Sequence, residues 1–147
     1  MSENKELTDL SYLRSLTGGA NDKMAKYIRM FLTGAPISLQ QMELYALSKD
    51  WSGLKGTAHA LKPQLGYFGA KGTEDLLKNI ERMAGDQVDL EQIPSSLENF
   101  KAQLDLITVE LEAQLKDTQL RAQAEIRNIQ ARAEREALAT SLSLRLP

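Results

Sequence analysis

The strongest constraint on the fold of this chain is the spacing of its apolar residues, which recur at steps of three and four along most of the sequence. This spacing places the apolar side chains on one face of a helix. Runs of β-branched residues are absent, whereas Leu, Ala, Lys, Glu and Gln, which favour helix, dominate the composition. We therefore expect an all-α fold without strands.

Four apolar stripes predict four longer helices. The first covers about residues 21–48 and contains Pro36, whose missing N–H predicts a kink or two helices in series. The others cover about residues 50–68, 73–84 and 94–115. Because short polar or glycine-rich segments separate them, the stripes predict an antiparallel four-helix bundle around one core.

Two further segments flank the predicted bundle. Leucines recur over residues 7–16 and predict a short N-terminal helix, ended by the Thr-Gly-Gly that follows. After residue 115 the sequence becomes rich in Gln, Ala, Arg and Glu. We therefore predict a bundle domain over residues 1–115 and, over residues 116–147, an extended helical or partly disordered tail that is solvated or weakly self-associating.

Composition excludes several classes of function. The 147 residues include 18 basic and 20 acidic ones, so no basic surface for nucleic acid or for anionic membrane is expected. The chain has no cysteine and one histidine, which excludes disulfides and disfavours a metal site. The first residues show no signal pattern, and no apolar run is long enough to span a membrane. We expect a soluble, cytoplasmic monomer.

The single histidine, His59, lies outside the apolar stripe of the second longer stretch, residues 50–68, so it should face solvent. Lys62 lies three residues after His59 and Lys55 lies four residues before it, so their ammonium groups can approach an anion on the imidazole. Gly66 lies two turns along the same strip and would let another protein's backbone approach, or else marks the end of the helix. Pro63 predicts a bend just past the histidine.

The residues around the histidine resemble the signature of histidine-containing phosphotransfer (Hpt) domains, namely Ala58-His59-Ala60-Leu61-Lys62 with Gly66 and Gly69-Ala70. The resemblance covers about residues 7–115, and Pro63 departs from it where the common form of the family has glycine. It implies that His59 accepts the phosphoryl group, that Lys62 steadies it and that Gly66 clears room for a docking receiver domain. We place Lys55 on the same docking face.

The resemblance also implies a function, which is that of a phosphohistidine intermediate in a two-component phosphorelay. The partners would be response-regulator receiver domains and a hybrid histidine kinase, and the receiver would supply the aspartyl phosphate and Mg²⁺. The chain itself would bind no cofactor. No phosphate-binding glycine loop is present in the sequence, so we expect a phosphocarrier and not an enzyme.

Two alternatives stay open from the residues. The dimerising helical domain of a sensor kinase also presents a histidine, but its pattern has an acidic residue directly after it, where this chain has Ala60. From another class, the chain could be a helical adaptor or scaffold in which His59 is an incidental surface residue.

Overall fold

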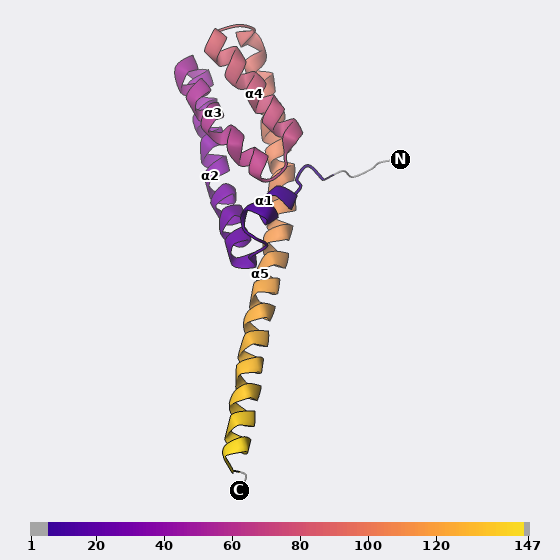
Figure 1. Cartoon of the computed structure of the whole chain (residues 1–147). Coiled ribbons are helices and arrows are strands. Elements are labelled where there is room, and N and C mark those ends of the chain that lie inside the picture. The colour runs from indigo at the N-terminus through magenta and orange to yellow at the C-terminus, as the bar shows by residue number, and fades with distance from the viewer. Residues whose placement is uncertain (1–5, 146–147) are drawn as a thin grey trace, which may run out of the picture.

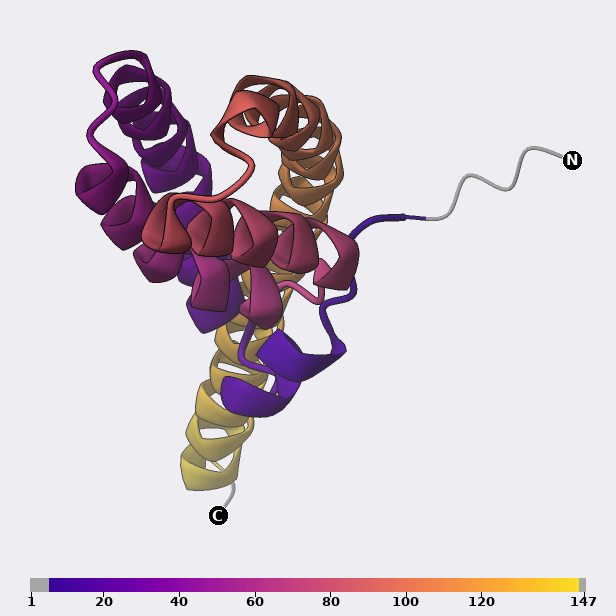
Figure 2. The ribbon, with the colours of Figure 1, turned by 90° about the horizontal axis from the view of Figure 1, so that it is seen from above.

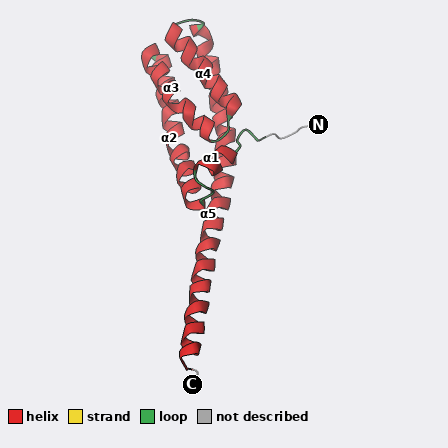
Figure 3. Ribbon diagram, in the orientation of Figure 1, coloured by secondary structure: helices red, strands yellow, loops and turns green. Residues whose placement is uncertain are grey.

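A computed structural model describes residues 6–145 of the chain, and within that range every regular element is a helix. The prediction of an all-α fold is therefore confirmed. The short stretch at each end, including the first five residues on which the expected lack of a signal rests, lies outside the described residues. Figures 1 and 3 show the elements, which are α1 (Ser11–Leu16), α2 (Asn21–Leu47), α3 (Trp51–Tyr67), α4 (Lys71–Asp86), the 3₁₀ turn η1 (Leu90–Gln92) and α5 (Ile93–Arg145).

The four longer helices form the predicted antiparallel bundle. Helix α2 packs on α3 and α5, and α4 packs on α3 and α5, so each helix has two neighbours. Figure 2 looks along the bundle and shows the short α1 lying beside it, while α5 continues far beyond the other helices (Figure 1). Both flanking segments, the short N-terminal helix and the extended C-terminal helix, are thus as predicted.

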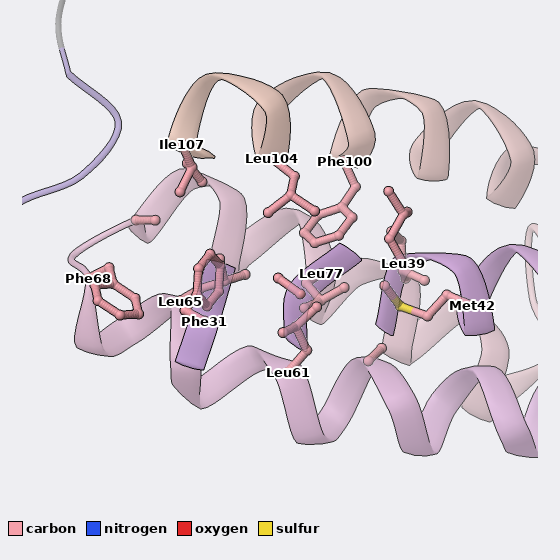
Figure 4. Packing of buried hydrophobic residues seen from close by; sticks show 14 of the residues in the cluster. Phe31, Leu39, Met42, Leu61, Leu65, Phe68, Leu77, Phe100, Leu104 and Ile107 are labelled. Carbon is pink, nitrogen blue, oxygen red and sulfur yellow. The ribbon is translucent and has the colours of Figure 1, made fainter. Parts of the chain in front are cut away.

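One apolar cluster holds the bundle together, and it draws on every α-helix. Figure 4 shows the side chains that meet at its centre, among them Phe31, Leu61, Leu65, Leu77, Phe100 and Leu104. The rings of Phe31 and Phe68 pack with centroids 5.0 Å apart, which ties α2 to the end of α3. Burial of this apolar area is the main stabilising term of the fold.

Helix α2 runs without a break through Pro36, so the predicted alternative of two helices in series is wrong. Proline removes one intrahelical hydrogen bond, but Ala35 and Leu39, on either side of it, are both buried in the core. Packing on both sides of the proline therefore keeps one helix in place.

The first helix begins at Ser11, four residues later than the leucine spacing predicts. The backbone N–H groups of Leu7 and Thr8 instead donate to the carboxylate of Glu110 on α5, each at 2.9 Å. A long-range contact thus uses the donors that a helical turn would leave without partners.

The turn between α3 and α4 requires glycine at position 69. Gly69 has a φ of +65°, and a Cβ there would lie 2.5 Å from the backbone oxygen of Asp9. The N–H of Ala70 donates to the carbonyl of Leu65 and that of Gly69 to the carbonyl of Gly66, which is the Schellman ending of a helix. The close approach of Asp9 also brings the N-terminal segment against this turn.

Gly69→Ala should lower the free energy of unfolding by about 2 kcal/mol or more, because left-handed strain of roughly 1–2 kcal/mol adds to the clash with Asp9. Gly18→Ala is the matched control, since Gly18 has a φ of +64° with no atom near its would-be Cβ. Urea unfolding of both variants measures the difference. Equal losses would show that the approach of Asp9 does not matter.

Beyond the bundle, α5 continues as one helix to Arg145. Its buried residues end with Leu111 and, one short stretch later, Thr118. The side-chain amide of Asn21, at the start of α2, donates to Glu125, so the two helices still touch there. The domain boundary at residue 115 stays a prediction. No helix in the described part of the chain is both long and apolar enough to span a membrane.

Candidate functional site

His59 lies on the outer side of α3, where 70% of its side chain is exposed. Asp50 begins the helix by accepting a hydrogen bond from the backbone N–H of Gly53 at 2.9 Å, which is an N-cap. Ala58 and Leu61, on either side of the histidine, are buried in the core. The apolar stripe thus fixes the rotation of α3 and turns His59 outward, as the sequence predicts.

A carboxylate from the next helix connects the histidine to a lysine. Glu81 on α4 lies with Oε1 2.7 Å from Nδ1 of His59, and its Oε2 accepts a hydrogen bond from Nζ of Lys62, also at 2.7 Å. Only 15% of the Glu81 side chain and 24% of the Lys62 side chain are exposed. The carboxylate is thus a half-enclosed bridge beneath an open imidazole.

The pKa of Glu81 is lowered from its ordinary value of 4.5. Burial by itself raises this pKa, but the hydrogen bonds from Lys62 and His59 and their positive charge outweigh it. Glu81 is therefore ionised at neutral pH. Because an ionised carboxylate only accepts hydrogen bonds, Nδ1 of His59 holds the hydrogen between them, and in a ring with a single hydrogen the lone pair is then at Nε2.

The lowered pKa of Glu81 predicts a pH dependence of stability. A depressed carboxyl pKa stabilises the fold above the unfolded value of 4.5, and this contribution is lost as the pH falls through the lower, folded value. The free energy of unfolding should therefore fall more steeply below pH 4.5 in the wild type than in Glu81→Gln. Denaturant unfolding across that range checks this, with Glu43→Gln, at an exposed carboxyl on α2, as control. Parallel curves for wild type and Glu81→Gln would contradict it.

The other two predicted residues, Lys55 and Gly66, also face α4. The carboxylate of Glu74 lies over Gly66, and a Cβ added at Gly66 would lie 3.3 Å from its Oε2 atom. This glycine is therefore half-buried and less exposed than the sequence predicts. The side-chain stem of Lys55 lies against Gly85. Helix α4 continues through Gly85 to Asp86, two residues beyond the predicted end at residue 84.

These contacts share one register. Gly66 and Glu74, His59 and Glu81, and Lys55 and Gly85 are each equally far from Ala70 in the chain, as expected for two antiparallel helices joined by a short turn. Glu81 is not among the residues predicted from the sequence, although it lies as far after Ala70 as His59 lies before it. Helix α3 also continues through Pro63 to Tyr67 without a break.

A groove runs between α3 and α4 beside the histidine. Charged side chains of both signs border it, the basic Lys55, Lys62, Lys78 and Arg82 and the acidic Asp75, Glu81 and Asp86. Lys62 is held by Glu81, whereas no hydrogen bond joins Lys55 to His59 or Glu81 in the described structure. The site therefore brings together His59, Lys62 and Glu81, with Lys55 and Gly66 further along the same helix.

Comparison with known proteins agrees with this geometry, since the family model of the Hpt domain matches residues 26–141, most of the chain. The chain belongs to the Hpt family. Hpt domains are phosphocarrier modules of phosphorelays, where they interact with receiver domains and kinases. No curated protein and no solved structure matches the chain. The family assignment confirms the resemblance drawn from the residues around His59.

Proposed function

We propose that His59 of this Hpt domain accepts a phosphoryl group from the aspartyl phosphate of one receiver domain and passes it to the aspartate of another. The observation that supports this most is the exposed imidazole held by a half-buried carboxylate at Nδ1. That contact leaves Nε2 as the free nucleophilic atom on the outer side of the ring.

In the proposed transfer, the lone pair of Nε2 attacks phosphorus while the bond from phosphorus to the aspartyl oxygen breaks. The receiver's aspartate leaves as a carboxylate, and an N–P bond forms on the imidazole. The ring then bears a positive charge with its hydrogen still on Nδ1, directed at Glu81 Oε1, 2.7 Å away. Glu81 thus offsets a charge that develops only during transfer.

Lys62 acts in the same proposal as the cation that steadies the phosphoryl group. Its ammonium group is already held next to the histidine by Glu81 Oε2. In this proposal the ammonium group turns from that oxygen toward a phosphoryl oxygen by a change of side-chain rotamer. The chain needs no cofactor of its own in this scheme, because the receiver supplies Mg²⁺ and the phosphate donor.

The direct test is incubation with a phosphorylated receiver domain. We expect phosphate to appear on the protein in an acid-labile, base-stable form. Transfer back to a second, unphosphorylated receiver tests the carrier role. Absence of label with any receiver, while the helical fold is intact, would favour the alternative of a helical adaptor with an incidental histidine.

Variants of Glu81 test the role of this carboxylate in the transfer. Glu81→Ala removes both the orientation of the ring and the opposing charge, and losing a charged hydrogen bond of about 1.5–3 kcal/mol should slow transfer roughly 10- to 100-fold. Glu81→Gln keeps an oxygen that can accept from Nδ1 and should lie between Ala and wild type. The rate of label transfer measures both, with Glu43→Gln as control. Wild-type rates in Glu81→Ala would exclude the role of this carboxylate.

A further inference from the structure

The part of α5 beyond the bundle has an uncovered apolar face. Apolar or hydroxyl side chains continue at steps of three and four after residue 125, and we call these residues the tail stripe: Ile126, Ile129, Ala133, Ala137, Thr140 and Leu144. Ile126, Ile129 and Leu144 are 55%, 66% and 82% exposed, and Leu138 and Leu142, on the opposite side of the helix, are 62% and 54% exposed. The tail stripe prolongs the side of α5 that faces the bundle core.

The bundle covers this side of α5 only up to the point where the tail stripe begins. Thr118 is buried, with 4% exposed, and Asn21 at the start of α2 donates a hydrogen bond to Glu125. The first turn of α2 therefore covers α5 as far as residue 125. The next stripe residue, Ile126, is the first without a neighbouring helix.

A helix of this length without tertiary contacts has little to hold it. Helices in proteins owe most of their stability to the packing of an apolar face. Within the described part of the tail, the only ion pair joins Arg121 to Asp117, before the tail stripe begins. Arg132 and Glu136 have the spacing of an ion pair but do not form one. Both features favour a partner along this face.

We propose that the tail stripe pairs with the tail stripe of a second copy of this chain, with the two helices antiparallel and related by a twofold axis near residue 135. The central layer then joins Ala133 to Ala137 of the second copy, and the small side chains let the helices approach closely. Ile129 meets Thr140 of the second copy, and Ile126 meets Leu144 of the second copy. An isologous pairing of this kind needs no other partner.

The position of the bundle decides the orientation. The tail stripe lies on the bundle side of α5, so in a parallel pair both bundles would lie between the two copies of α5 and collide. In the antiparallel pair, Leu144, near the end of the second copy's helix, lies beside Ile126 of the first copy. The start of α2 of the first copy lies just beyond this point. The two bundles then lie at opposite ends, and each α3–α4 face stays free.

Charge supports the same arrangement. Arg132 and Glu136 lie on one edge of the tail stripe, and the antiparallel pair sets Arg132 opposite Glu136 of the second copy, twice by symmetry. The other edge has the uncharged Gln130 and Ser141 and the acidic Glu134, which lies opposite Glu134 of the second copy. The two pairs of opposite charge on the first edge therefore outnumber the single pair of like charges on the second. This inference does not depend on the proposed phosphoryl transfer.

The test is the mass of the full chain in solution, measured by sedimentation equilibrium over a range of concentrations. The wild type should associate to a dimer. Ala133→Glu places a charge in the central layer and should give a monomer at concentrations where the wild type is dimeric. Ala131→Glu, on the opposite side of the same helix, is the matched control and should stay dimeric. A monomeric wild type, or a dimeric Ala133→Glu, would overturn the proposal.

Disulfide trapping tests the orientation, because the chain has no cysteine of its own. Ile129→Cys and Thr140→Cys, mixed as two single variants of different mass, should form the mixed disulfide. Each alone should not, since its two copies would be about 15 Å or more apart along the axis. Disulfides within each variant and none between them would indicate a parallel pair and overturn the proposal.

Discussion

His59→Gln is expected to abolish phosphoryl acceptance completely. The glutamine side chain has no atom that can form the N–P bond, and no other histidine exists in the sequence. The variant should still fold, because 70% of the histidine side chain is exposed and an outward residue contributes little to packing. Radiolabel transfer from a phosphorylated receiver measures the loss.

Two controls make this result decisive. Circular dichroism and thermal unfolding should show nearly unchanged helix content and a midpoint within a few degrees of the wild type, so a loss of label cannot come from unfolding. Label that persists on His59→Gln would refute the assignment of the phospho-accepting residue, whereas a variant that loses its fold would show that His59 is structural.

Gly66→Gln should slow transfer from a receiver by about a hundredfold, equivalent to about 2.7 kcal/mol, yet leave acceptance from phosphoramidate unchanged. Gly66 lies two turns, about 10 Å, along α3 from His59, so a large side chain there stands where a protein donor must approach. The fold should tolerate it, because the nearest atom to the new Cβ is the Glu74 carboxylate, the mobile end of a side chain.

The matched control for this variant is Gly34→Gln on α2, where a Cβ meets no atom within 4 Å. It should transfer at the wild-type rate with both donors. A wild-type rate for Gly66→Gln with the receiver would refute the docking role of this position. Equal loss with both donors would indicate instead that Gly66 is needed for folding.

Lys62→Ala should behave differently from Gly66→Gln, because it removes a charge next to the reacting atoms and leaves the docking surface in place. The rate or the phosphohistidine lifetime should change with both donors, within the few kcal/mol that one charged contact supplies. The variant also leaves Glu81 with one hydrogen-bond partner, His59. Rates measured with both donors for each variant therefore separate docking from chemistry.

Much of the bundle could be predicted from residue spacing alone, since burial of an apolar face dictates both the helices and their rotation. The outward position of His59 follows from the burial of Ala58 and Leu61 on the same helix. Element ends were less predictable. Ser11 begins α1 because Glu110, a residue far along the chain, takes the preceding backbone donors, and no local pattern near residue 7 reveals that contact.

Some residues of the candidate site were likewise predictable from local spacing and others were not. Lys55, Lys62 and Gly66 are found by their spacing from the histidine on one helix. Glu81 is not, because it belongs to α4, and its place depends on the register of two helices across a turn. For Gly66 the sequence predicts too much exposure. A glycine in an outward strip predicts bare surface, but a side chain from the neighbouring helix lies over it.

Helix α5 has a mechanical consequence for any assembly that uses its far end. No glycine or proline interrupts it after Pro94, so a bundle wall and the distal segment form one continuous helical rod. Each residue inserted into such a rod turns everything beyond it by about 100° and advances it by about 1.5 Å. The direction in which His59 points is therefore at a fixed rotation about the α5 axis relative to the distal end. A single residue inserted into α5 between the bundle and the distal segment would change that rotation and leave both parts intact.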